Sequence, residues 1–228
     1  MINKKVVALI GILCGLYFSF YVYAAEISSI DIINKVQQNF DLIQDLRANL
    51  SITATIEGNS SNRIIQKLRH TMKKPDKIKI EDINNNRRID NYFNNISQNN
   101  IFMENILWPD PTLLFTIKSY LENFTITSKY DSILNLYIIA AIPKSQTKEF
   151  PKMEWFVDYE KGVVVKILIY NVTGHLDGII EIEYKQITDK ILFPSKIIDT
   201  IIASLNTTKK EIIYENIEIN TNIGDNEF

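Results

Sequence analysis

Residues 46–57 read LRANLSITATIE, and every second side chain in this run is apolar. Such strict alternation is typical of a half-buried antiparallel β-strand, which has one apolar face and one face in water. The polar sequence GNSSN follows at residues 58–62 and predicts a turn. A second alternating run, with Leu68 and Met72 on its apolar side, follows the turn. The two runs therefore predict a long β-hairpin with one apolar face.

Strand-like runs continue along most of the chain. Up to eleven of them lie between residues 46 and 219, and only about three amphipathic helices accompany them. The first helix is predicted to begin at Ser28 or Ser29, because serine is a favoured N-cap residue. Ile33 and Phe40 lie on the apolar stripe of this helix. A sheet this large with so few helices either closes on itself or leaves an apolar hollow. The predicted fold class is α+β, mostly β, in one domain.

The middle of the chain changes its pattern twice. Pro75 interrupts the second strand, after which Ile78 and Ile80 alternate with lysines, and a weaker strand marked by Phe93 is predicted over residues 87–96. The alternation then stops, and two short helices are predicted. Their apolar residues are Phe102, Met103, Ile106, Leu107, Leu113, Leu114, Ile117 and Leu121.

Strands resume near residue 124 and are predicted to form a meander that ends near residue 219. Gly162, Gly174 and Gly178 are predicted to mark hairpin turns within it. The last residues, 220–228, form a polar tail.

The first residues have the pattern of an export signal. Lys4 and Lys5 precede an uncharged run over residues 6–25, and a signal peptidase is expected to cleave after Ala24. The domains are then a signal peptide, residues 1–24, and a single folded domain, residues 25–228. Because the run is long enough to span a bilayer, a retained inner-membrane anchor is the alternative. Lipidation at Cys14 is a third hypothesis, disfavoured by the bulky Leu13 before it.

Composition excludes several function classes. Without Lys4 and Lys5 the chain has 23 basic and 27 acidic residues, a net charge of −4, which does not suit a nucleic-acid binder. Its only cysteine is in the export segment, so the exported domain folds without a disulfide. The two histidines are isolated, and no nucleophile or phosphate-binding motif is present. We therefore expect no metal, no cofactor and no enzymatic activity.

Two short motifs resemble a known family. The sequence KKPDKIKI at residues 73–80 places a basic residue and a proline before an alternating strand, and WFVD at 155–158 precedes KGV at 161–163. With the order of elements, these motifs resemble the periplasmic lipoprotein carrier LolA and its superfamily, over most of residues 28–219. The resemblance implies an incomplete, or half, barrel formed by a curved antiparallel sheet. An N-terminal helix and a helical lid would lie over its apolar concave face, which accepts acyl chains.

The resemblance also assigns roles to residues. The lid would be residues 101–121, and Lys74 would control it together with Gln66 and His70. Well-studied carriers of this kind have an arginine at the position of Lys74, and a lysine cannot reproduce its planar fork of donors. Gln66 and His70 lie on the apolar side of the second strand, so they either form a hydrogen-bonding spot in the cavity or mark a bulge or a wet strand end. The lipid-binding residues would be Leu50, Ile52, Ala54, Leu68, Met72, Ile78, Ile80, Phe93, Phe102, Leu107, Leu113, Leu114 and Ile117.

The expected function is that of a monomeric periplasmic carrier. It would bind lipid or the acyl chains of lipoproteins, receive them from an inner-membrane loading complex, and deliver them to an outer-membrane acceptor. Three alternatives stay open at this point. They are a lipid- or lipoprotein-sensing module that acts through a protein partner, a membrane-anchored carrier, and an enzyme on a similar open barrel.

Overall fold

Eleven strands form one antiparallel sheet in the computed structural model, which describes residues 27–56, 64–74, 77–84, 87–88, 117–144, 152–202 and 207–228. The strands are β1 (Asp45–Ile56), β2 (Ile64–Lys73), β3 (Lys77–Asp82), β4 (Arg87–Arg88), β5 (Phe124–Asp131), β6 (Leu136–Pro143), β7 (Lys152–Asp158), β8 (Val163–Tyr170), β9 (Leu176–Thr188), β10 (Ile191–Ile202) and β11 (Thr207–Ile219).

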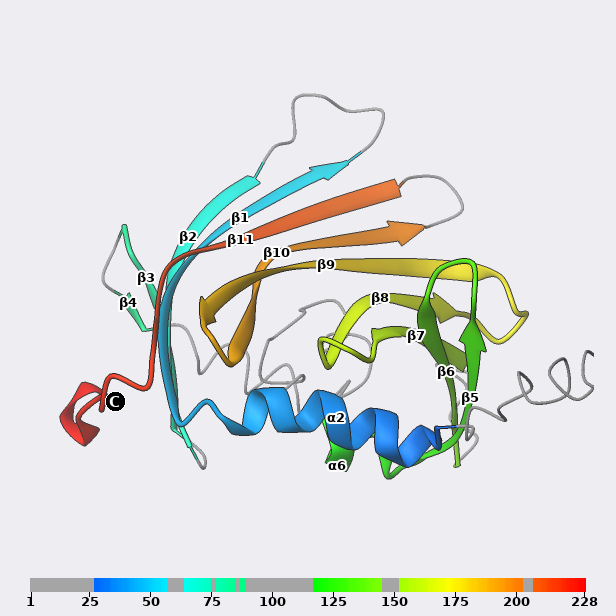
Figure 1. Cartoon of the computed structure of the whole chain (residues 1–228). Helices are drawn as coiled ribbons and strands as arrows, with labels where there is room; N and C mark the ends of the chain where they lie inside the picture. Colours follow the sequence, from blue (N-terminus) through cyan, green and yellow to red (C-terminus); the bar gives the residue numbers. More distant parts are fainter. Residues whose placement is uncertain are drawn as a thin grey trace, which may run out of the picture.

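The sheet is curved and open. Its strand order is β4-β3-β2-β1-β11-β10-β9-β8-β7-β6-β5, so the described β4 and β5 are its two edges and β1 pairs with the last strand, β11. Figure 1 shows the sheet arching over helix α2 (Ser29–Asp41), which crosses the open side. The predicted incomplete half-barrel with an N-terminal helix is therefore confirmed.

The register of β1 places its apolar side chains on the concave face. Leu46 lies opposite Met72 of β2, and Leu50 lies opposite Leu68 of β2 and Tyr214 of β11. These five side chains are all buried, as is Ala48 between Leu46 and Leu50, whereas Arg47, Asn49 and Ser51 on the opposite face are half-buried. The alternation in residues 46–57 thus sorts the side chains between the hydrophobic core and solvent, as the sequence predicts.

Helix α2 begins where the sequence predicts, because the Ser28 side chain accepts a hydrogen bond from the backbone N–H of Asp31. Its apolar stripe is buried, and the helix contacts β5, β8, β10 and the short helix α6 (Ile117–Leu121). Asn39 fixes it to β10 by donating to the Leu192 carbonyl oxygen at 3.0 Å and accepting from the Leu192 N–H at 3.4 Å.

Two of the three predicted turn glycines are in turns. Gly162 and Gly174 have φ angles of +64° and +80°, which only glycine adopts without strain. Gly178 is instead within β9, so the prediction of a turn there is wrong. An added Cβ at Gly178 would meet the Ile169 side chain at 3.4 Å, so the glycine leaves room for that side chain on the neighbouring strand.

The polar tail after β11 is folded against the sheet. The buried Asp45 carboxylate accepts hydrogen bonds from the backbone N–H groups of Thr221 and Asn222, at 2.8 and 3.0 Å. Asp225 then forms ion pairs with Lys73 and Lys77, at 2.6 and 2.9 Å. A buried carboxylate therefore anchors a segment that the sequence marks only as polar.

In the part of the chain that the structure describes, every helix is too short or too polar to traverse a lipid bilayer. Residues 1–26 lie outside the described residues, so cleavage after Ala24 stays a prediction.

A pair of glycine substitutions tests the contact between α2 and the β7–β8 turn. A Cβ at Gly162 would lie 2.9 Å from the Lys35 carbonyl oxygen of α2, whereas a Cβ at Gly174 would meet nothing within 4 Å. Gly174→Ala should cost about 1 kcal/mol, the strain of a left-handed alanine. Gly162→Ala should cost roughly twice as much, because α2 must also shift. Equal losses in the free energy of unfolding by urea would contradict this contact.

Candidate functional site

The candidate site is the apolar concave face of the sheet. The register brings five of the predicted lipid-binding residues together on strands β1 to β3, and all five are buried in one hydrophobic cluster. They are Leu50, Ile52, Leu68, Met72 and Ile80. The cluster continues through β6 to β11, so apolar side chains cover this face across most of the sheet.

Three further predicted residues lie at the margin or under the cover. Ala54 is half-buried opposite Lys210, and Ile78 is 37% exposed, although it pairs with Met72 on the same face. Ile117 of α6 is fully buried in the cluster. The other predicted residues, Phe93, Phe102, Leu107, Leu113 and Leu114, lie outside the described residues, as does most of the predicted lid.

Much of the described cover over this face comes from α2, the N-terminal helix that the family resemblance places over the concave face. Ile32, Ile33, Val36 and Phe40 of α2 belong to the same hydrophobic cluster as the concave strands. The concave side chains of the cluster are at most 8% exposed, so in this conformation the face is covered. A ligand must displace part of this cover to reach it.

Lys74 lies at the C-terminal end of α2. Its Nζ donates to the Phe40 carbonyl oxygen at 3.0 Å and lies 3.8 Å from a carboxylate oxygen of Asp41. Its backbone N–H donates to the Gln44 carbonyl oxygen. Burial lowers the pKa of Lys74, and Asp41 offsets part of that effect. A cation at the carbonyl end of a helix is favourable, so Lys74 holds α2 against the β2–β3 corner.

The two polar residues predicted on the apolar side of β2 differ in burial. His70 is 2% exposed and lies opposite Ala48 and Ile80, whereas Gln66 is half-buried opposite Ile52. The β1–β2 register runs without a shift from Asp45 to Ala54, so a bulge is not the reason for their position. His70 is therefore a polar group inside the cluster.

A charge pair that the sequence pattern does not reveal lies on the same face. Asp199 of β10 is opposite Lys210 of β11, with 3.7 Å between Asp199 Oδ2 and Lys210 Nζ. Asp199 is 2% exposed, and its Oδ2 accepts no hydrogen bond from any described residue. Both parities of β10 are apolar around Asp199, so alternation could not place it, but Lys210 shares its parity with Ile212 and Tyr214 of β11.

Burial dominates the electrostatics of this pair. It raises the pKa of Asp199 to about 6 and lowers the pKa of Lys210, and their mutual attraction offsets only part of either effect. The pair thus lowers the stability of the packing on an otherwise apolar face.

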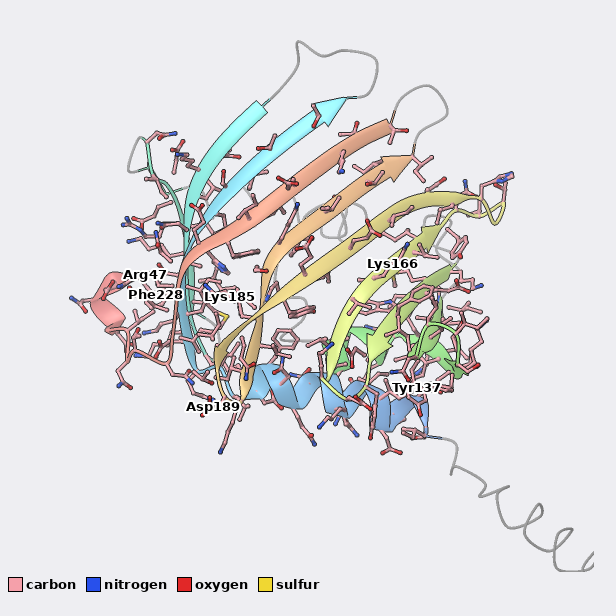
Figure 2. The ribbon with its side chains drawn as sticks, turned by 45° about the horizontal axis from the view of Figure 1, so that its top comes forward. Arg47, Tyr137, Lys166, Lys185, Asp189 and Phe228 are labelled. Carbon is pink, nitrogen blue, oxygen red and sulfur yellow. The ribbon has the colours of Figure 1, made fainter. Side chains whose placement is uncertain are left out.

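Other chemical sites are not supported by the described residues. No group of three His, Cys, Asp or Glu side chains among them could hold a metal ion. Glu181 and Glu183 are exposed, and Glu181 lies 3.4 Å from Lys166, on the convex side labelled in Figure 2. Two hollows lined wholly by described residues, of about 570 and 530 Å³, are bordered mainly by charged and amide side chains. The concave face is therefore the apolar surface suited to a lipid.

Comparisons with known proteins identify the fold. No family model matches the sequence, and no curated protein matches it. Three solved structures cover most of the chain at low identity. A DUF1329 family protein from Desulfovibrio piger has a TM-score of 0.58 and 12% identity, over 87% of this chain and 94% of its own.

Two further structures have a similar fold. A protein described as an outer membrane lipoprotein-sorting protein domain, from Vibrio parahaemolyticus, has a TM-score of 0.53 and 13% identity, over 86% and 94% of the two chains. A LolA superfamily protein from Nitrosomonas europaea has a TM-score of 0.54 and 9% identity, over 89% and 97%. The chain therefore shares the fold of these three proteins, which confirms the resemblance at the level of the fold.

A lysine pair tests the contact at the end of α2. Lys74→Met removes the hydrogen bond to the Phe40 carbonyl oxygen and should lower stability by about 1 kcal/mol. Amide hydrogen exchange should speed up in the last turn of α2, whereas Lys74→Arg should keep most of the protection. Lys67→Met, which replaces an exposed lysine on β2, is the control. Unchanged exchange in Lys74→Met would remove its role in holding the helix.

The Asp199–Lys210 pair predicts a pH-dependent stability. The folded state raises the pKa of Asp199 above its ordinary value of 3.8. The contribution of Asp199 to the free energy of unfolding is therefore full below pH 3.8 and is lost as the pH rises through about 6. At pH 8 the ionised, buried Asp199 should lower the free energy of unfolding by about 3 kcal/mol relative to its value at low pH. Asp199→Asn/Lys210→Met should therefore be more stable than the native chain by about 1–4 kcal/mol at pH 8.

That gain should shrink at pH 3, where Asp199 is mostly protonated in both the folded and the unfolded state, and the remaining gain reports the burial of Lys210. Urea unfolding at the two pH values measures both quantities. A variant that is less stable than the native chain at pH 8 would show that the pair stabilises the fold.

Proposed function

We propose that this protein is a non-enzymatic carrier that binds lipid or the acyl chains of lipoproteins on its concave face. The observation that carries the proposal is the continuous apolar cluster on the inside of an open, curved sheet, with an amphipathic helix across it. The likeness to a lipoprotein-sorting domain and a LolA superfamily protein supports it.

The energetics of such a site set a requirement for its cover. Each buried methylene of an acyl chain gains about 0.8 kcal/mol, so a long chain on a bare apolar face would be held too tightly to release. In the covered state the face is already packed against α2 and α6. Acyl chains that displace this cover replace one apolar contact with another, so the net affinity is the difference between the two.

The contacts that hold α2 are suited to such an exchange. Outside the apolar stripe, the described contacts of the helix include those of Asn39 with Leu192, Lys74 with Phe40, Ser29 with Ser128 and Gln37 with Lys118. Each is a single hydrogen bond or a short pair, with a net value of about 1 kcal/mol. The predicted lid, residues 101–121, is the second element of the proposed cover. We propose that Lys74, Gln66 and His70 control its opening.

The proposed location is the periplasm, reached by cleavage after Ala24, or the periplasmic side of the inner membrane if residues 6–25 are retained. The proposed partners are an inner-membrane loading complex and an outer-membrane acceptor, with the carrier acting as a monomer. We propose no catalytic step, because the described concave face is mainly apolar, with Gln66, His70, Tyr214 and the Asp199–Lys210 pair among its polar groups.

Native lipid content tests the proposal. The protein, purified from its exported compartment without detergent, should release acyl-containing lipid or lipoprotein on solvent extraction, and mass spectrometry should identify it. Ile52→Asn places a polar amide on the concave face and should reduce the bound lipid at least severalfold. Ser51→Asn, on the opposite face of the same strand, is the matched control.

Circular dichroism shows whether both variants keep the fold. The proposal fails if the native protein carries no acyl species and a fluorescent fatty acid cannot be loaded. It also fails if Ile52→Asn and Ser51→Asn, both folded, retain equal amounts of lipid.

A further inference from the structure

The hairpin between β5 and β6 presents two large apolar side chains to water. Ile133 is 93% exposed and its neighbour Leu134 is 53% exposed. They lie at the tip of the turn that joins Asp131, the last residue of β5, to Leu136, the first residue of β6. Single exposed apolar residues are common, but two adjacent ones at a projecting tip form a compact apolar surface.

The turn holds this tip in one shape. The Asp131 carboxylate accepts hydrogen bonds from the backbone N–H groups of both Ile133 and Leu134, each at 3.0 Å. Asn135 has a φ of +54°, and its side chain accepts a hydrogen bond of 2.6 Å from the Tyr130 hydroxyl. The apolar side chains are therefore presented on a turn that local hydrogen bonds already order, so little entropy is lost when they bind.

Tyrosines lie directly behind the tip. The Tyr130 and Tyr137 rings are 5.1 Å apart, and the Tyr137 and Tyr159 rings are 5.5 Å apart. Tyrosine has an apolar ring and a polar hydroxyl, and it concentrates at the level of lipid headgroups in membrane proteins. An apolar tip followed by tyrosines matches the polarity profile of a bilayer surface.

The start of the described chain lies on the same part of the molecule. The Ser29 hydroxyl of α2 donates to the Ser128 hydroxyl of β5 at 3.1 Å. The uncharged residues 6–25, which are long enough to span a bilayer, end just before Ser28, the N-cap of this helix. Where residues 6–25 are retained as an anchor, the bilayer surface is therefore near Ser28, at the end of the molecule that includes β5.

We propose that the β5–β6 tip is a membrane-docking element, and that Ile133 and Leu134 insert into the surface of a lipid bilayer while the tyrosines lie among the headgroups. The contact is weak and reversible, because even a whole myristoyl chain gives a binding constant of only about 10⁴ M⁻¹. It is apolar in origin, so it needs no anionic lipid, which suits a chain with a net charge of −2.

This inference extends the proposed function, since a carrier exchanges its cargo at membranes, but it rests on different residues. Docking of the tip and binding on the concave face are therefore separable by experiment.

An environment-sensitive label tests the insertion in the full chain. In a Cys14→Ser background, Ile133→Cys is labelled with the fluorophore NBD and mixed with phosphatidylcholine vesicles. The matched control is Val172→Cys, which is 63% exposed in the native chain. Val172 follows the last residue of β8, Tyr170, which pairs with Lys152 at the start of β7. The β5–β6 tip lies at the opposite end of these strands, because Tyr137 pairs with Val157 near the end of β7.

The label at 133 should brighten at least threefold, be quenched by nitroxide lipids within the bilayer, and keep its response in 0.5 M salt. The label at 172 should not change. Adding Leu134→Asp to the chain labelled at 133 should lower the response at least fivefold. No response at 133, or equal responses at 133 and 172, overturns the proposal.

A response at 133 that requires an added protein, or that follows self-association without vesicles, assigns the tip to a protein partner or a second copy and also overturns it. Lipid extraction from Ile133→Asp/Leu134→Asp separates the two hypotheses. If this variant retains its cargo but no longer docks on vesicles, the result supports membrane docking by the tip and does not test lipid binding on the concave face. Lost cargo in that variant shows that the tip instead acts through the cargo site.

Discussion

The structure depends on one constraint, the burial of a single apolar face by a sheet that does not close. β1 supplies the centre of that face, because it pairs on one side with β2 and on the other with β11. A shift of one residue in either register would move Leu46, Leu50 and Ile52 to the solvent side. The curvature of the sheet and the position of α2 both follow from the need to cover this face.

Cover by helices makes this face different from an ordinary sheet core. In a closed barrel, the strands would cover one another and no element could leave without unfolding the sheet. Here Phe40 and its neighbours on α2 fill the concave side, and hydrogen bonds at the ends and middle of the helix attach it to the sheet. The face can therefore exchange its cover without loss of strand pairing, which is the physical basis of the proposed carrier function.

Polar groups on the concave face limit how tightly it packs. His70 and the Asp199–Lys210 pair lie among apolar side chains. Burial raises the pKa of Asp199 and lowers the pKa of Lys210, and both shifts favour the neutral side chains. Such groups lower the stability of the covered state. At the margin of the molecule the reverse occurs, since Ile133 and Leu134 are apolar and exposed. Both departures from the simple rule of apolar inside and polar outside coincide with proposed functional surfaces.

Alternation predicts burial well where one face of a strand is wet. The period of two by itself assigns Leu50, Leu68 and Met72 to the buried face, and the side-chain chemistry of Ser28 predicts the N-cap. Alternation fails at Asp199, because both faces of β10 are apolar there. The predicted turn at Gly178 is wrong because a glycine in a strand and a glycine in a turn look alike in sequence.

The sequence by itself determined the local periods, and through them the mostly β fold and the side of each long strand that is buried. These depend on neighbours one to four residues apart, within reach of backbone geometry. Only the tertiary structure decided that β1 pairs with β11 and that Lys74 holds the C-terminal end of α2. It also decided that Asp199 meets Lys210 and that Asp45 anchors the tail. These contacts join residues far apart in the chain, and their energies exist only once the sheet has curved.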